Sequence, residues 1–340
     1  MKRRLGAARL GLTREITATP AQTFATGPNA KAQENNTLSY EGYTKVWGDE
    51  FDGDSLNRDD WNVETHEKGW VNSELQEYVD SEENIQVKDG KLVINPVKKV
   101  SSIESNAVGN LLKNSDFSEG MEGWTQTIAN WGGETGSADA STKEVVSYTS
   151  GRVSTQNKQT FTYGRFECRA KVPKGQGYLP AFWLMANDEN VYGQWPRCGE
   201  IDCMEVMGQE TNKAYGTVHY GNPHAQSQGT YYTGENESDF SDDFHVFTCD
   251  WEPGKITWYV DGVKYHEEND WYSTTVGQGT LAYPAPFDQP FYIILNLAVG
   301  GSWVGNPNDE TSFENNPYEI DYVRVYQKDS YNEDVKRPVK

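Results

Sequence analysis

The stretch Gly199-Glu200-Ile201-Asp202-Cys203-Met204-Glu205-Val206-Met207-Gly208 places three carboxylates within six residues, between apolar side chains. Alternate residues of a β-strand face the same side, so a regular strand would separate Glu205 from Glu200 and Asp202. In a helix the two glutamates would lie about 140° apart, and the apolar residues would form no continuous stripe. One extra residue in a β-bulge near Cys203 would bring all three acids to one face, with Ile201 and Cys203 directed into a core. The stretch therefore predicts a bulged strand.

Carboxylates that share one face repel each other, so the pKa of at least one must rise. Such crowding is typical of sites where the acids do chemistry. Two carboxyl groups about 5–5.5 Å apart serve a retaining glycosidase, one as nucleophile and the other as proton donor. The spacing alone does not assign these roles to particular residues. A solvated acidic edge strand is the alternative in a chain this acidic.

The stretch resembles the E-x-D-x-x-E signature of glycoside hydrolase family 16. Other segments similar to this family follow in the family's order between about residues 44 and 328: Trp47–Gly53, Asn72–Tyr78, Tyr163–Glu167, Trp195–Glu200 and Ile320–Tyr326. The resemblance implies an all-β fold, a β-sandwich jelly roll of the concanavalin A-like architecture. Within the family the chain is most similar to the laminarinase-like endo-β-1,3-glucanases. Lichenases lack the extra residue that Met204 supplies, which argues against that branch.

The same resemblance implies roles for individual residues. It assigns Glu200 as nucleophile, Glu205 as general acid and then general base, and Asp202 as the residue that holds and tunes the nucleophile. Substrate-binding residues implied by the matching segments, or assigned for their place near the acids, are Trp195, Trp183, His219, Asn72, Glu77 and Arg197. We expect His219 to contact a sugar hydroxyl or the acids, whereas His66, His224, His245 and His266 carry no signal of function.

Many members of the family bind a structural calcium ion, and the matching positions here are Glu50, the carbonyl of Gly90, and Asp321. Oxygen ligands from distant parts of a chain suit this hard cation. Ordinary acids in turns are the alternative. Catalysis itself is expected to need no cofactor.

Composition and charge narrow the range of partners. The 340 residues are 13% aromatic and 36% hydrophobic, which fits many half-buried strands and an aromatic-lined surface. A net charge of −21 argues against nucleic acid and anionic membranes as partners. No run approaches the ~20 apolar residues of a membrane span. The expected partners are β-glucan polysaccharides and oligosaccharides, bound by a monomer.

The chain divides into a leader or its remnant over residues 1–40, a catalytic domain over 41–330, and a tail over 331–340. The leader lacks a convincing signal peptide, so a secreted or cell-surface location is inferred from the substrate alone. Residues 100–144 form an insertion relative to the family pattern. Its segment from Asn110 to Trp124 resembles the opening of a carbohydrate-binding module, and Trp124 and Trp131 could stack on sugar or pack on the sandwich.

Two shorter patterns support the β interpretation. Asp89-Gly90 between two alternating segments predicts a hairpin with a type I′ turn. The apolar run Ala181–Met185 predicts a central strand. The cysteines, which are expected to be buried free thiols rather than disulfides or metal ligands, are Cys168, Cys198, Cys203 and Cys249.

Three functions remain open at this point. The leading hypothesis is a retaining endo-β-1,3-glucanase that acts on laminarin-like glucans. A mixed-linkage β-1,3-1,4-glucanase or a galactan hydrolase of the same family is the first alternative. A lectin-like glucan-binding protein is the second, and three crowded carboxylates argue against it, because a pure binder does not need them.

Overall fold

The computed structural model describes residues 40–103, 143–234, 239–277 and 279–339. These residues form twenty β-strands and no helix, so the predicted all-β class is confirmed. It follows that no helix in this part of the chain could span a membrane. The expected leader, apart from Tyr40, lies outside the described residues.

Sheet 1 has eight strands in the order β16-β15-β14-β9-β20-β5-β4, with β1 paired to β20. Its strands are antiparallel: β1 (Thr44–Asp49), β4 (Ile85–Lys88), β5 (Lys91–Ile94), β9 (Gly164–Lys171), β14 (His245–Glu252), β15 (Lys255–Val260), β16 (Val263–Glu268) and β20 (Tyr318–Gln327). The turn between β4 and β5 is Asp89-Gly90, with φ of 55° and 70°. Two positive φ values in a two-residue loop are those of the predicted type I′ turn.

Sheet 2 has seven strands in the order β13-β12-β11-β10-β19-β8-β2, again all antiparallel. Its strands are β2 (Asn62–Val63), β8 (Arg152–Ser154), β10 (Tyr178–Ala186), β11 (Glu200–Glu205), β12 (Lys213–Tyr220), β13 (Ala225–Tyr232) and β19 (Phe291–Val299). The apolar run Ala181–Met185 falls in β10, the middle strand, as predicted. The acidic stretch is its neighbour, β11.

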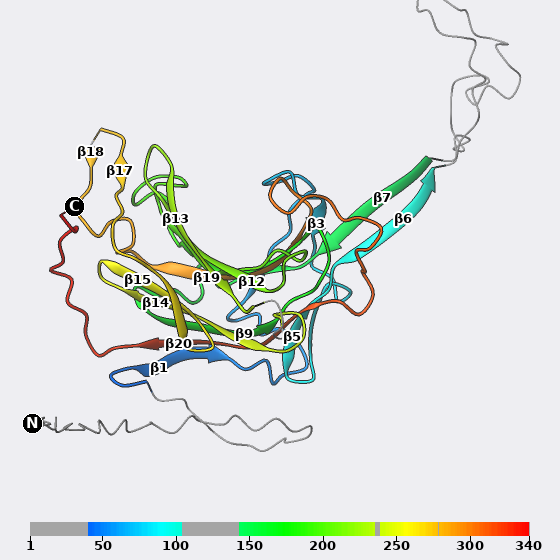
Figure 1. The fold of residues 1–340 in the computed structure, drawn as a ribbon, viewed down its shortest axis with the longest axis horizontal. Helices are drawn as coiled ribbons and strands as arrows, with labels where there is room; N and C mark the ends of the chain where they lie inside the picture. The colour runs from blue at the N-terminus through cyan, green and yellow to red at the C-terminus, as the bar shows by residue number, and fades with distance from the viewer. Residues whose placement is uncertain (1–39, 104–142, 235–238, 278, 340) are drawn as a thin grey trace, which may run out of the picture. The chain divides into compact units, whose positions relative to one another are not determined.

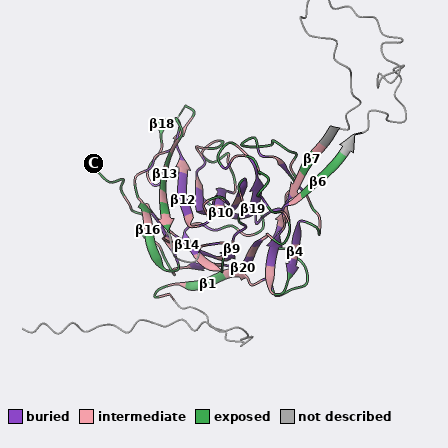
Figure 2. Cartoon of the chain, turned by 45° about the vertical axis from the view of Figure 1, so that its right-hand side comes forward, coloured by how far each residue is buried: buried purple, intermediate pink, exposed green. Residues whose placement is uncertain are grey.

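Figure 1 shows the two sheets as layers, with β12, β13 and β19 in one and β9, β14 and β20 in the other. The layers meet over a core that fully buries large side chains such as Phe182 and Phe291 from sheet 2 and Phe166, Trp251 and Trp258 from sheet 1. Figure 2 shows this burial along β10, β12 and β19, in contrast to the exposed surfaces of β1 and β16. Each fully buried large apolar side chain contributes about 1.5–3 kcal/mol, so the core holds the layers together. The predicted sandwich is confirmed.

Two small sheets complete the described fold. Strand β7 (Lys143–Ser150) pairs antiparallel with β6 (Val97–Ile103) and parallel with β3 (Gln76–Tyr78), and β17 (Thr274–Thr275) pairs with β18 (Gly279–Thr280). Strands β6 and β7 enclose residues 104–142. The module-like segment of the expected insertion, with Trp124 and Trp131, therefore lies outside the described residues.

The four cysteines are buried and free. Cys168 and Cys249 come from sheet 1 and Cys203 from sheet 2, and all three belong to the core between the layers. Burial raises the pKa of Cys168 and Cys198 and keeps their thiols neutral. As expected from the sequence, they act as small apolar core residues.

Candidate active site

Strand β11 contains one extra residue between its second acid and its third. Against β10, Asp202 pairs with Trp183, but the next pair joins Met204 to Phe182, so Cys203 has no partner of its own. The pairing with β12 shifts at the same place. Two residues of one strand opposite one residue of its neighbour is the pattern of a bulge. The bulge predicted near Cys203 is confirmed.

The bulge returns Glu205 to the face that carries Glu200. Both carboxylates line one cleft, with a volume of about 370 Å³. Asp202 lies between them in the strand and is 3% exposed. On the opposite face Ile201 and Cys203 are buried in the core, as the sequence predicts. The three acids thus lie close to one another because of a single inserted residue.

The bulge is held from across the core. The backbone carbonyl of Asp202 accepts a 2.8 Å hydrogen bond from Nε1 of Trp258, which belongs to β15 of sheet 1. A bulge interrupts the hydrogen bonds between strands, and Trp258 satisfies the carbonyl that would otherwise be buried alone. The indole can approach because residue 216 is glycine: a Cβ there would lie 2.4 Å from Cδ1 of Trp258.

The electrostatic environment raises the pKa of both glutamates. Burial is the largest cause, and the nearby carboxylate of Asp202 is the next. The pKa of Glu200 rises to about 8, and the pKa of Glu205 rises well above its usual value. Three carboxylates this close cannot all be ionised at neutral pH, so the cluster retains at least one proton.

The surroundings of the two glutamates differ in a way that locates this proton. The charge of Glu200 is favoured by His219, by a hydrogen bond from Trp195, and by Arg152. For Glu205 every neighbouring charge acts in the opposite direction, because Glu200 and other carboxylates raise its pKa further. The proton is therefore better placed on Glu205 and the negative charge on Glu200.

His219 on β12 faces the acids. Its Nε2 lies 3.3 Å from Oδ2 of Asp202 and 3.7 Å from Oε1 of Glu200. Burial alone would lower the pKa of His219, but the two carboxylates outweigh burial and raise it. Its Nδ1 lies 2.9 Å from Nε2 of His224, in the turn between β12 and β13. The expected contact of His219 with the acids is present, and His224, which carried no signal in the sequence, is its partner.

Two tryptophans expose their rings at the cleft. Trp195 is 45% exposed, and its ring centroid lies 6.0 Å from that of His219 and 5.0 Å from that of His224. Trp303 is 42% exposed and packs edge-on against Tyr215 at 5.4 Å. Both side chains line the same cleft as the acids. The sequence analysis named Trp195 but missed Trp303, which follows the Gly300-Gly301 bend at the cleft rim.

Trp183 lies on β10 beside the acids. Its Nε1 donates a 2.7 Å hydrogen bond to Oδ1 of Asn296, and the Arg152 guanidinium lies 4.8 Å from its ring centroid. Arg152 in turn bonds Glu64 at 2.6 Å and is 6% exposed. Trp183 therefore supports a buried cation whose charge favours the ionised form of Glu200. Arg152 was not singled out in the sequence analysis.

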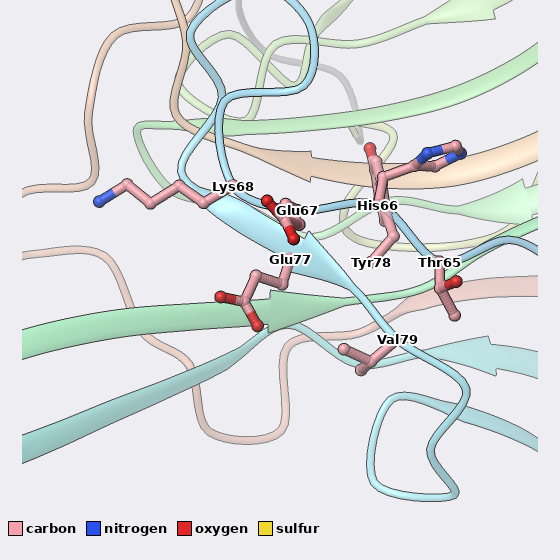
Figure 3. Close-up of a pocket in the computed structure, with 7 residues that line it drawn as sticks. All are labelled: Thr65, His66, Glu67, Lys68, Glu77, Tyr78 and Val79. Carbon is pink, nitrogen blue, oxygen red and sulfur yellow. The ribbon is translucent and has the colours of Figure 1, made fainter.

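The segment Asn72–Tyr78 divides between two pockets. Asn72 and Glu74 line the cleft of the acids. Glu77 points away from it, toward a separate pocket formed with residues 65–68 and Val79, which is shown in Figure 3. The alternation in β3 explains this, because Gln76 and Tyr78 are buried and Glu77 between them is exposed.

Glu74 is the acid that the sequence analysis missed in this segment. It accepts hydrogen bonds from Gln76 at 2.7 Å and Asn72 at 3.4 Å, and burial raises its pKa. Its even spacing from Gln76 and Tyr78 was the signal that could have identified it. Arg197, by contrast, packs its guanidinium against Gly193 in the loop before β11 and does not line the cleft with Trp195.

Two of the residues expected to bind calcium, Glu50 and Asp321, have other partners in this structure. Glu50 accepts hydrogen bonds from Lys45 at 2.6 Å and from both Nε and Nη2 of Arg324, and Asp321 bonds Arg169 at 2.8 Å. Carboxylates already neutralised by cations fit a calcium ion poorly, since the ion would have to replace these pairs. The calcium site stays a prediction.

Comparison with known proteins agrees with this geometry. The family model described as glycosyl hydrolases family 16 matches residues 112–324. The chain is 37% identical over 291 residues to a glucan endo-1,3-beta-glucosidase of Cryptopygus antarcticus, covering 82% of this chain and 90% of that protein. It is 35% identical over 329 residues to glucan endo-1,3-beta-glucosidase A1 of Niallia circulans, covering 90% of this chain but only 42% of that longer protein.

A solved structure shows the same fold. The endo-beta-1,3-glucanase from Pyrococcus furiosus superposes with a TM-score of 0.62 at 36% identity, covering 85% of this chain and 95% of that one. The jelly-roll sandwich inferred from the strand order is therefore the fold of a structurally known relative.

Proposed function

Because the chain belongs to family 16 of the glycosyl hydrolases, we propose that it is a retaining endo-β-1,3-glucanase that hydrolyses laminarin-like glucans. The observation that carries the proposal is the bulge in β11, which brings Glu200, Asp202 and Glu205 together at one cleft. Paired carboxyl groups on either side of a glycosidic bond are the machinery of retaining hydrolysis.

In the first half of the reaction Glu200 attacks the anomeric carbon while Glu205 gives its proton to the departing glycosidic oxygen. The distribution of charges supports this assignment, because His219, Trp195 and Arg152 favour the ionised form of Glu200 and nothing comparable acts on Glu205. Asp202 keeps the pKa of Glu205 high, so that the proton is present when the bond breaks.

In the second half the glycosyl ester on Glu200 is neutral, so the negative charge that raised the pKa of Glu205 is reduced. Glu205 can then accept a proton from water, and the water attacks the anomeric carbon from the side that the leaving group vacated. Two inversions at one carbon restore the original configuration. In both halves of the reaction, the proton that moves is given or accepted by the carboxyl group of Glu205.

The cleft walls support a polysaccharide as the substrate. The exposed rings of Trp195 and Trp303 offer flat apolar surfaces of the kind on which sugar rings stack. A cleft open to solvent admits the interior of a long chain, which endo cleavage requires. The named activities of the similar proteins favour β-1,3-linked glucan as that chain.

Two alternatives are kept. Family 16 also includes mixed-linkage glucanases and galactosidases, so a β-1,3-1,4-glucan or a galactan is the first alternative substrate. The family further includes glucan-binding members without catalysis. The raised pKa values of Glu200 and Glu205 argue for chemistry here, because burying such acids destabilises the fold and is typical of active sites.

Product analysis on three polymers tests the proposal. We expect laminarin to be cut to a ladder of oligosaccharides, lichenan more slowly, and agarose not at all, with NMR showing the β-anomer as the first product. Preferred cleavage of lichenan or agarose would transfer the assignment to another branch of the family. First release of the α-anomer would contradict the double-displacement mechanism, and binding of laminarin without cleavage would favour the lectin-like alternative.

A further inference from the structure

We propose that the acid cluster also binds a divalent transition-metal ion of the Zn²⁺ class, held by Glu200, Asp202 and His219. One ligand atom from each residue lies within 4.8 Å of the others. The metal site is argued from the positions of these side chains and does not depend on the proposed function. Its consequence, competitive inhibition of hydrolysis by the metal, rests on the proposed function, because the ion would occupy the carboxylate that acts as nucleophile.

The distances between the ligand atoms fit the ion. Zn²⁺ bonds nitrogen and carboxylate oxygen at about 2.0–2.2 Å in tetrahedral sites, which places the ligand atoms about 3.3–3.6 Å apart. Nε2 of His219 lies 3.3 Å from Oδ2 of Asp202 and 3.7 Å from Oε1 of Glu200. These two distances need to change by only a few tenths of an ångström, whereas the two carboxylate oxygens lie within 4.8 Å of each other and would have to approach by up to about 1.5 Å. The open side of the cleft leaves the fourth position to water.

A second observation points to a missing ligand. Oδ2 of Asp202 is buried and has no hydrogen-bond partner among the described residues. The 3.3 Å approach of His219 is close enough for electrostatic attraction, but it does not have hydrogen-bond geometry. A buried carboxylate oxygen without a partner is unfavourable, and a cation bound there would satisfy it.

The far side of the imidazole is arranged as in a metal site. Nδ1 of His219 lies 2.9 Å from Nε2 of His224. A metal ion would displace the proton that Nε2 holds toward the two carboxylates, and Nδ1 would then donate its hydrogen to His224 while Nε2 offers its lone pair to the ion. Histidines that bind metal nearly always have their other ring nitrogen fixed by an acceptor in this way.

The set of donors selects the kind of ion. Ca²⁺ and Mg²⁺ require six or more oxygen ligands, whereas one imidazole and two carboxylates suit Zn²⁺. Glu205 is not among the three ligands. A metal-bound cleft would therefore retain its proton donor but lose its nucleophile.

Calorimetric titration of the full chain with Zn²⁺, after treatment with chelator, tests the site. We expect one saturable site that His219→Gln weakens at least about tenfold, whereas His245→Gln leaves it unchanged. His245 is the matched control because it pairs with Asp261 on sheet 1. His224→Ala should weaken binding by about 10–100-fold, the usual effect of losing an outer partner, and His224→Gln by less, since its amide oxygen still accepts.

A measurement on the unaltered chain guards against misfolded variants. Co²⁺ in place of Zn²⁺ should give the intense visible absorption of a tetrahedral site, and Zn²⁺ should abolish it. No saturable Zn²⁺ binding, or binding that His219→Gln leaves unchanged, would overturn the metal site. Glu205→Gln separates the two proposals, because it should bind Zn²⁺ as tightly as the wild type while losing hydrolysis.

Inhibition assays complete the comparison. Zn²⁺ should raise the apparent KM for laminarin without changing kcat, and EDTA should reverse the effect. A chain that binds Zn²⁺ through His219 but never cuts a glucan would contradict the proposed function and leave the metal site standing. A chain that cuts laminarin normally in saturating Zn²⁺ would refute the inhibition.

Discussion

Two groups of acidic side chains have opposite surroundings, one at sheet 1 and the other on strand β11 of sheet 2. At sheet 1, Glu50 bonds Arg324 and Lys45, and Asp321 bonds Arg169. Burial would raise the pKa of Glu50, but these partners lower it below its usual value. On sheet 2 Glu200 and Glu205 lie among other carboxylates, and their pKa values rise. Between these two groups, it is the cation partners that separate an acid that stabilises the fold from one available for chemistry.

The largest expected effect comes from removing the nucleophile. Glu200→Ser should lower kcat at least about a thousandfold, because the covalent step is lost, while binding of an oligosaccharide stays measurable. Laminarin hydrolysis and calorimetric binding of laminarihexaose would be measured side by side. Substantial residual hydrolysis would show that the reaction does not pass through Glu200.

A smaller effect is expected from the acid between the two glutamates. The charge of Asp202 raises the pKa of Glu205, and Glu205 acts in its protonated form, so activity falls as the pH rises through this pKa. Asp202→Asn should lower the pKa, move the alkaline limb of the pH–rate profile to lower pH, and reduce kcat at neutral pH about tenfold. The matched control is Asp250→Asn on sheet 1, whose partner is Arg165. A profile that shifts in neither variant would separate Asp202 from the proton donor.

Replacing an acid by its amide should change the thermal stability in opposite directions at Glu205 and at Glu50. Glu205 has a raised pKa in the folded state, so its carboxyl stabilises the fold at low pH, and this contribution is lost as the pH rises toward the folded-state pKa. Glu205→Gln should therefore raise Tm at pH 8 and change it little at pH 4. In a domain of this size, a gain of about 1 kcal/mol in the free energy of unfolding raises Tm by about 2–4 °C.

Glu50 provides the counterpart. Its lowered pKa means that its charge stabilises the fold above pH ~4.5 and that this contribution is lost as the pH falls. Glu50→Gln should lower Tm at pH 8 by about 2 °C, a small effect because the side chain of Glu50 is 35% exposed. Thermal melts of both variants at pH 4 and pH 8 test the comparison, and shifts of equal sign would remove it.

The last prediction concerns calcium. If the ion binds Glu50, Gly90 and Asp321, excess EDTA should lower Tm by a few degrees in the wild type and much less in Asp321→Ala, because a ligand of the folded state alone stabilises it by mass action. Mg²⁺ serves as the control ion. Identical melts with and without EDTA would show that the ion pairs of Arg324 and Arg169 have taken the place of the metal.

The bulge was accessible from the sequence because it follows from alternation along one strand, and the sandwich was accessible because the resemblance to family 16 implied it. The three acids can share one face of the strand, and their apolar neighbours the other face, only if one extra residue is inserted near Cys203. His224 and Arg152 were not accessible, since their roles depend on partners brought together by folding: Arg152 bonds Glu64, 88 positions away. Glu74 was partly accessible from the sequence. Its spacing from Gln76 placed it on the buried face, yet the family resemblance drew attention to Glu77.

The hydrogen bond from Trp258 to the carbonyl of Asp202 means that the spacing of the acids is set by the opposite layer of the sandwich. Loops around the cleft rim other than those that carry Trp195 and His224 can therefore be exchanged without disturbing the spacing of the acids. Because of this contact, the rate of hydrolysis should depend on whether the core between the two sheets is intact. As the protein is warmed, turnover should fail as soon as the two layers begin to part, before the strands within either sheet have separated.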